Sequence, residues 1–247
     1  MKIRTILLSS LIIVIYGNSF GQKDTTIHTI PIYWTFELGS SFLTSTKIIE
    51  NRKAPFYPTA SGSIYFNWDI PMRKTNTISR TGFSIAPGIG LGASTFSINK
   101  KLSENNGLII IENIVDPYEY SYIQGIYFDI PMDFRYLTPP NSKRQNFSFE
   151  IGSKVGRLVY TERKISINEK DESYIHKTKN VGILNKFRYG INAKISYRKI
   201  NISKNNEALG LSFSIIGNYY LSDAFIGQSN INSKSFSIGA GLGFIFN

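Results

Sequence analysis

The most regular alternation of apolar and polar residues occupies the C-terminal end of the chain, from Ser235 to Asn247. Its even positions are apolar up to Phe246, and its odd positions from 235 to 243 are serine or glycine, with Ile245 as an exception before the terminal Asn247. Because successive side chains of a β-strand point to opposite faces, this pattern predicts a strand with one apolar face and one face of small residues. A tilted strand of about 9–11 residues spans the hydrocarbon of a bilayer, and this segment is long enough to do so.

Seven further segments show the same period of two, which gives eight predicted strands. They cover residues 31–44, 59–71, 81–97, 121–137, 146–160, 184–199, 208–220 and 235–246. The short connections are 73–80, 138–145 and 201–207, and the longer ones are 45–58, 98–120, 161–183 and 221–234. Short turns that alternate with long loops are typical of an outer-membrane barrel with both termini in the periplasm. The sequence therefore predicts an all-β fold: an eight-stranded antiparallel up-and-down transmembrane β-barrel with short periplasmic turns and longer extracellular loops.

The segment 184–199 indicates which face of the sheet lies outside. One of its faces is apolar at every second position from Phe187 to Tyr197. The other face carries four cations, Lys186, Arg188, Lys194 and Arg198. A Lys or Arg that faces lipid at mid-depth costs about 2–4 kcal/mol, so we expect the charged face to line the lumen. A soluble lipocalin-like periplasmic binding protein would also alternate, but the small residues between Ser84 and Ser94 favour a narrow lumen.

The N-terminus has the features of a secretory signal peptide. Two cations precede a short apolar run at residues 6–15, and small residues follow up to Gly21. We expect export through the Sec pathway, cleavage near Gly21, and a barrel domain that covers residues 22–247. The absence of cysteine excludes a lipoprotein anchor, disulfides and thiol chemistry. The formal net charge of +11 suits anionic lipopolysaccharide better than nucleic acid in an exported, aromatic-rich strand protein.

Strand alternation assigns ten charged residues to an ion-pair network in the lumen. They are Glu37, Asp69, Asp129, Asp133, Glu150, Lys154, Lys186, Arg188, Lys194 and Arg198. Arg135 is expected close to the periplasmic rim. An eight-stranded barrel is just wide enough for side chains to fill, and buried charges need partners, so we expect a plugged lumen. The predicted role is structural or interactive, through extracellular loops that contact lipopolysaccharide, surface ligands or a protein partner. The alternatives are a narrow channel or an accessory subunit of a secretion or transport machine.

Catalytic and metal-binding chemistry has little support in the sequence. A barrel enzyme that acts on lipid needs a His, a Ser and a carboxylate at one membrane rim. The two histidines are His28, before the first strand, and His176, in a polar loop. Two distant histidines and scattered carboxylates show no metal-ligand spacing. We therefore expect no enzymatic activity, no metal and no cofactor.

Three peripheral features also lead to predictions. Arg157 follows the lipid-facing positions of its strand and is expected to contact lipid headgroups, with an unpartnered snorkelling residue as the alternative. The apolar segment 108–111 is expected to form an intramolecular β-ribbon, with a docking edge as the alternative. Pro87 and Pro131 each remove a ladder hydrogen bond, so we expect a bulge or local bend at each.

The segment from Tyr127 to Tyr136 (YFDIPMDFRY) resembles the YLEIPLLLKY stretch of the PorT-like outer-membrane β-barrel family of Bacteroidetes. The end of the expected signal peptide, NSFGQ, is also typical of that phylum, and the resemblance extends loosely to the C-terminus. It implies an eight-stranded OmpX- or OmpA-like barrel, inserted by the barrel assembly machinery through Phe244 and Phe246. Asp133 replaces an apolar residue of the family pattern. The namesake takes part in type IX secretion, but the resemblance implies no single activity.

Overall fold

The computed structural model describes ten stretches of the chain: residues 32–43, 59–72, 81–98, 100–105, 108–113, 118–169, 172–179, 182–202, 208–226 and 234–246. The expected signal peptide, its cleavage near Gly21, and His28 lie outside the described residues. Within these stretches the structure contains strands and turns, and no helix long and apolar enough to cross a membrane.

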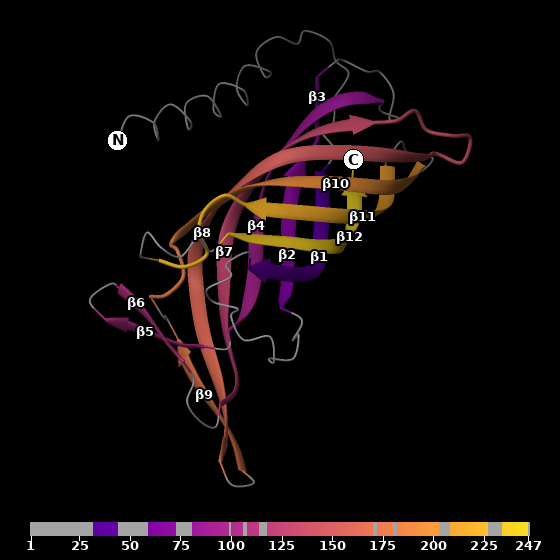
Figure 1. Ribbon diagram of the computed structural model, residues 1–247. Helices are drawn as coiled ribbons and strands as arrows, with labels where there is room; N and C mark the ends of the chain where they lie inside the picture. The colour runs from indigo at the N-terminus through magenta and orange to yellow at the C-terminus, as the bar shows by residue number, and fades with distance from the viewer. Residues whose placement is uncertain are drawn as a thin grey trace, which may run out of the picture.

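Eight long strands form a closed antiparallel barrel (Figure 1). They are β1 (Ile32–Leu43), β2 (Ala60–Trp68), β4 (Gly82–Ile98), β7 (Tyr118–Leu137), β8 (Gln145–Glu169), β10 (Phe187–Ile202), β11 (Ala208–Tyr220) and β12 (Ser235–Phe246). Each strand pairs with the next long strand along the chain, and β12 pairs with β1 to close the ring. The short strand β3 (Ile70–Pro71) continues the direction of β2 and pairs with β4. The predicted all-β, eight-stranded up-and-down barrel is confirmed.

The two faces of the barrel wall differ sharply in chemistry. Strand β10 shows this best: Tyr189, Ile191 and Ile195 are each more than half exposed, whereas Arg188 and Lys194 on the other face are buried. Aromatic and aliphatic side chains are also exposed on β1, β4, β7, β8, β11 and β12, and Phe66 and Trp68 on β2 are partly exposed. The alternation in the sequence therefore places apolar side chains outside and charged or small side chains inside.

The two ends of the barrel carry different connections. We call the end with Ile32 and Phe246 the terminal end and the opposite one the loop end. At the terminal end, the turn between β7 and β8 is organised by Asn141, whose side-chain oxygen accepts hydrogen bonds from the backbone N–H groups of Lys143 and Gln145, at 3.0 Å each.

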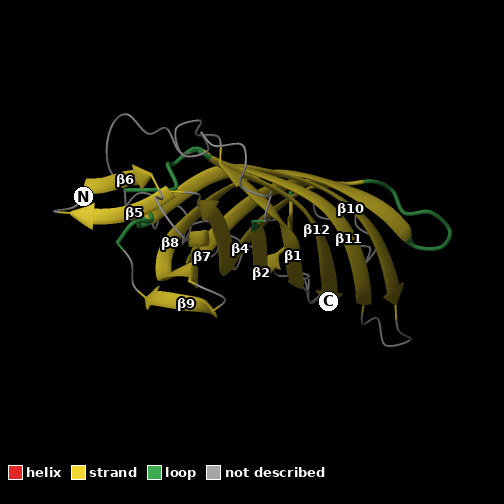
Figure 2. Cartoon of the chain, turned by 60° about the horizontal axis from the view of Figure 1, so that its bottom comes forward, coloured by secondary structure: helices red, strands yellow, loops and turns green. Residues whose placement is uncertain are grey.

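The connections at the loop end contain more strand than the sequence indicated. The segment 161–183 was expected to be a loop, but β8 continues through it to Glu169 and pairs with β9 (Glu172–Lys179) as a projecting hairpin (Figure 2). The loop interpretation was wrong because polar residues on both faces of a water-exposed strand hide the period of two. In the connection 98–120, β5 (Lys100–Asn105) pairs with β6 (Leu108–Asn113), which confirms the intramolecular ribbon.

The two prolines inside strands do not cause bulges. Pairing between β4 and β7 stops after Pro87 and Met132 and resumes at Gly90 and Asp129 in the same register, so two residues on each strand, including Pro131, are left out of this ladder. Of the expected bulge or local bend at each proline, the bulge was wrong, because a missing donor leaves a gap in the ladder without an extra residue. The bulge near the barrel rim lies instead between β7 and β8, at Ile126 and Tyr127.

Candidate functional site

The charged side chains of the lumen are arranged in rungs across three neighbouring strands, β7, β8 and β10. A rung here is a set of directly paired residues whose side chains point inward. Where the β8 residue of a rung is glycine, the side chains from β7 and β10 contact each other above it. Where the β8 residue is charged, its own side chain contacts the neighbouring side chains. The spacing between β7 and β10 is about 10 Å, which long side chains can bridge only when nothing stands between them.

The rung nearest the loop end joins Asp129 on β7 to Arg188 on β10, with Gly156 between them. The Arg188 Nη2 atom lies 2.6 Å from Asp129 Oδ2, and Nε lies 3.1 Å from Oδ1, so the pair has two contacts. A Cβ atom at Gly156 would overlap both side chains. The Tyr65 hydroxyl donates a 2.9 Å hydrogen bond to Asp129, which is fully buried. The rings of Tyr127 and Tyr220 lie 4.1 and 4.8 Å from the guanidinium, so the Arg188 charge is enclosed on several sides.

The two middle rungs contain one hydrogen-bonded carboxylate and one buried lysine. Asn192 donates a 2.8 Å hydrogen bond to Asp133 across Gly152, whose missing side chain again leaves room. Lys154 donates a 3.1 Å hydrogen bond to Asn218 on β11 and lies over the ring of Tyr65, at 4.5 Å from its centroid.

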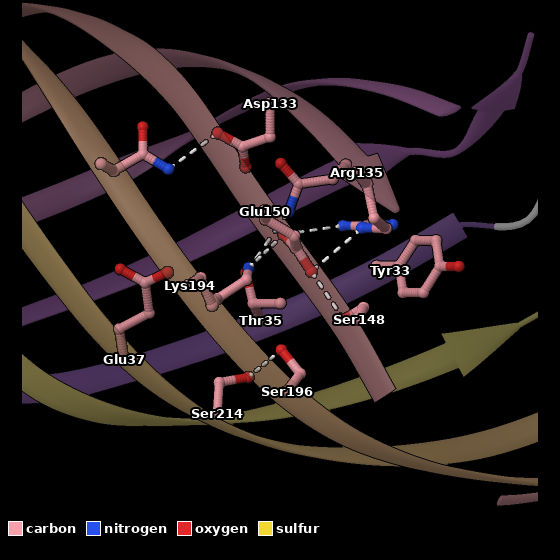
Figure 3. A network of polar contacts seen from close by, with 12 residues as sticks. Tyr33, Thr35, Glu37, Asp133, Arg135, Ser148, Glu150, Lys194, Ser196 and Ser214 are labelled. Atoms are coloured by element: carbon pink, nitrogen blue, oxygen red, sulfur yellow. Dashed lines mark hydrogen bonds and ion pairs between the residues drawn. The ribbon is translucent and has the colours of Figure 1, made fainter. Parts of the chain in front are cut away.

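The rung nearest the terminal end contains three charges in a row, Arg135, Glu150 and Lys194 (Figure 3). Glu150 lies 3.0 Å from Arg135 Nε and 3.1 Å from Lys194 Nζ, and it accepts a 3.0 Å hydrogen bond from Ser148. Arg135 also lies 3.4 Å from Asp69, which lies between β2 and β3, and β2 is the next strand but one from β7. The Glu150 carboxylate therefore holds two cations, and the cluster extends from β10 to the residue that follows β2.

A tyrosine links this cluster to the remaining cation. The Tyr33 hydroxyl accepts a 2.7 Å hydrogen bond from Arg198 and donates one of 2.7 Å to Asp69. Its ring lies 4.5 Å from the Arg135 guanidinium. Tyr33 on β1 therefore links Arg198 on β10 to Asp69 through its hydroxyl group.

The structure brings most of the predicted lumen residues into these contacts but not all of them. Lys186 is exposed and precedes β10, because the chain turns across the barrel mouth before the strand begins. Arg135, predicted close to the periplasmic rim, lies in the rung nearest the terminal end and is buried there. Glu37 is half-buried and accepts a 2.9 Å hydrogen bond from Ser63. If Arg135 replaces Lys186 in the set of ten predicted lumen residues, that set contains as many carboxylates as cations.

An apolar cluster that the sequence did not suggest closes the loop end of the lumen. Its buried members are Phe96, Ile123, Ile183, Leu184, Ala224 and Phe225, with Leu158 and Ile226 packed against them. Two connecting segments supply most of it, and they bond to each other through Asn185 N–H to Ala224 O and Ile226 N–H to Ile183 O, at 2.9 Å each. In the sequence, the cluster is marked only by pairs of adjacent apolar residues, such as Ile183-Leu184, within otherwise polar connections. Such pairs are too short to predict that their side chains are buried.

One cavity inside the barrel is small and polar. A polar cavity of about 20 Å³ lies between Glu37 and Arg188, and Ser63, Asn218 and Ser237 also line it. A volume of this size holds about one water molecule. Among the described residues, side chains therefore occupy most of the lumen around this cavity.

Outside the barrel, Arg157 is exposed at a position whose cross-strand neighbours are Phe128 on β7 and Phe187 on β10. The backbone of His176 pairs with Ile165 in the projecting hairpin. Among the described residues, no cluster of histidine and carboxylate side chains could hold a metal ion.

No protein-family model and no curated protein matches this sequence. Among solved structures, the chain is similar to Ail, the attachment invasion locus protein of Yersinia pestis, in a complex with the heparin analogue sucrose octasulfate (8% identity over 88% of this chain and 99% of Ail, TM-score 0.32). It is also similar to neisserial surface protein A (11%, 86% and 95%, 0.31) and to the N-terminal β-barrel domain of Pseudomonas aeruginosa OprF (10%, 87% and 97%, 0.24). At TM-scores this low the similarities carry no argument, and the fold rests on the strand pairing itself.

Proposed function

We propose that this protein is an integral outer-membrane β-barrel whose lumen is plugged and whose role is structural or interactive, through its loop end. One observation carries the proposal: the barrel wall is apolar outside and charged inside. Phe134, Tyr189 and Ile215 are each more than half exposed, whereas Asp129 and Lys154 are buried. A soluble barrel would expose so much contiguous apolar surface at a high risk of aggregation, whereas a transmembrane barrel requires it. This arrangement argues against the lipocalin-like alternative.

The noncatalytic part of the proposal rests on how the lumen residues are used. The Asp129–Arg188 and Glu150–Arg135–Lys194 contacts bond these charged groups to each other. The described lumen contains no histidine, and its cavity has room for about one water molecule. The projecting β8–β9 hairpin and the β5–β6 ribbon offer surface for a protein partner at the loop end.

The finer parts of the proposal concern family, orientation and export. The resemblance at Tyr127–Tyr136 supports membership of the PorT-like family of Bacteroidetes, with the signal peptide removed near Gly21 and the barrel inserted by the assembly machinery. Asp133 departs from that pattern and accepts a hydrogen bond inside the lumen, which fits a plug. The loop end then faces the cell exterior, and the outer surface of the barrel at that end contacts lipopolysaccharide.

Membrane fractionation and a gel of heated and unheated protein test the barrel. We expect the mature chain in the outer-membrane fraction, with a band that migrates faster before heating because the closed barrel survives in detergent. A soluble periplasmic protein whose mobility does not depend on heating would overturn the proposal.

The polar cavity beside Glu37 favours a second candidate function, a narrow channel. Single-channel recording in a planar bilayer distinguishes this channel from the plugged barrel. The plugged barrel predicts no discrete openings from a heat-modifiable preparation. Regular openings whose ion selectivity changes in Lys194→Met would support the channel, because that lysine would then line an open path.

A further inference from the structure

The β-bulge near the barrel rim exchanges the two faces of β8. On the side of the bulge nearer the terminal end, odd residues of β8 such as Val155 and Arg157 point outward, and each is paired with an outward residue of β7. At the bulge, Ile126 pairs with Tyr160 and Tyr127 with Leu158, so Val159 is the extra residue. Above it the even residues point outward, because an inserted residue shifts the strand by one position relative to its partner.

This shift decides which cation of the pair Arg163 and Lys164 lies on the outer wall. Arg163 pairs with Ile123, a buried member of the apolar cluster, and is therefore on the inner side. Lys164 pairs with Tyr122 on β7 and with Lys177 on β9, so these three side chains share the outer face. An uninterrupted strand would have exposed Arg163 instead.

The outer face of this region forms a compact basic surface. We call it the outer basic face, and its members are Tyr122, Gln124, Glu162, Lys164, Lys177 and Lys179. Lys177 and Lys179 are exposed, whereas Lys164 lies 3.6 Å from Glu162 and over the ring of Tyr122, at 5.4 Å from its centroid. Three cations against one carboxylate leave the face positively charged.

The height of this face follows from the length of the apolar band below it. On β7 the outward residues are apolar or aromatic from Tyr136 to Ile126, which is roughly 33 Å of strand. At a tilt of 35–45°, that length gives a band about 25 Å tall, the height of the apolar band of transmembrane barrels. The rungs of Gln124 and Tyr122 come next and lie about 5–10 Å above the band, where the headgroup region of a bilayer begins.

We propose that the outer basic face binds the phosphate groups of anionic lipid in the outer leaflet of the membrane that the barrel spans. Three features of this face point to this occupant: the position at headgroup height, the outward direction set by the bulge, and the complementary charge. A lysine near an anionic membrane surface contributes roughly fivefold in affinity, and Tyr122 occupies the level at which barrels carry interfacial aromatic residues. The inference rests on the proposed membrane location and adds the residues that contact the lipid.

The test is a titration of the purified barrel, in nonionic detergent at about 0.15 M salt, with bisphosphorylated lipid A. The test variant is K164Q/K177Q/K179Q. The matched control, K143Q/R144Q/K199Q, removes three exposed cations at the terminal end. Both variants keep the lumen contacts described above, and heat-modifiable migration confirms that each one folds. We expect the test variant to bind about tenfold more weakly or worse, and the control to stay within about threefold of the parent protein.

Two further probes identify what is recognised. Lipid A without its phosphates should bind weakly to the parent protein, and equal binding would overturn phosphate recognition. A heparin fragment, which has no acyl chain, should bind much more weakly than lipid A, and equal binding with the same loss in the test variant would overturn the lipid as occupant.

The inference is also overturned if the test variant binds lipid A as the parent does, or if the control loses as much. These failures differ from failure of the proposed function, in which the parent chain itself shows no heat-modifiable band and no outer-membrane location.

Discussion

Asp129 and Arg188 form a two-point ion pair across an intervening strand, with Arg188 Nη2 at 2.6 Å from Asp129 Oδ2. The contact exists because the intervening β8 residue is Gly156, whose backbone lies between them and whose side-chain position they occupy. Gly92 on β4 is similar, because a Cβ atom there would overlap the same two side chains. The glycines of this lumen therefore provide space for charged side chains of neighbouring strands.

Replacing Gly156 by alanine should destabilise the barrel. The added methyl group would displace the Asp129–Arg188 pair, and overpacking of this kind costs about 1–3 kcal/mol. The matched control is Gly217→Ala on β11, where a Cβ atom meets nothing within 4 Å and a neutral or slightly stabilising effect is expected. Urea unfolding in lipid vesicles, followed by the fraction of heat-modifiable band, measures both. Equal midpoints for the two variants would contradict this account of the glycine.

Replacing Lys194 by methionine should also destabilise a plugged barrel. Glu150 would keep Arg135 but lose one of its two cations in a buried site, so the loss should lie near the lower end of the roughly 3–5 kcal/mol expected for breaking a buried ion pair. Lys199→Met on the same strand is the control, because Lys199 is exposed. The same unfolding assay applies. A lumen open to water would instead make both lysine variants about as stable as the parent.

The alternation of the strands was sufficient to predict the barrel and the inward direction of Asp129, Arg188 and Lys194, because each strand must hide its charges from the outer surface. Pairing between particular charges was not predictable. It depends on which residue of β8 lies between two partners, and therefore on the register of three strands at once. The position of Gly152 between Asp133 and Asn192 is visible only once that register is known.

Two features of the loop end left no usable signal in the sequence. The bulge at Val159 lies inside the run Leu158-Val159-Tyr160, where apolar residues follow one another and conceal the change of face. The apolar cluster joins Leu184 and Phe225, which are paired as an isolated bridge between two separate connections. Burial of such short segments depends on tertiary contacts, so local periodicity does not reveal it.

Replacing Tyr33 by phenylalanine should weaken the link between Arg198 and Asp69. The ring would remain beside Arg135, but both hydrogen bonds of the hydroxyl would be lost and their buried partners left with fewer contacts. Leaving buried polar partners unsatisfied costs about 1–3 kcal/mol, and more where they are charged. Tyr197→Phe is the control, because that tyrosine lies on the outer face. Equal urea midpoints for the two variants would mean that Tyr33 does not connect the two charges.

The apolar cluster should control access to the lumen from the loop end. Because the chain has no cysteine, a single Ser237→Cys substitution at the polar cavity reports access to a charged methanethiosulfonate reagent. The cavity lies below the cluster, so this cysteine should react about tenfold more slowly than Lys177→Cys on the exposed hairpin, or slower still. Adding Leu184→Asp places an unpaired charge in the cluster. That change should open the mouth and raise the Ser237→Cys rate by about tenfold, while the Lys177→Cys rate stays the same. Fast labelling of Ser237→Cys in the otherwise unchanged barrel would show that the cluster does not close the lumen.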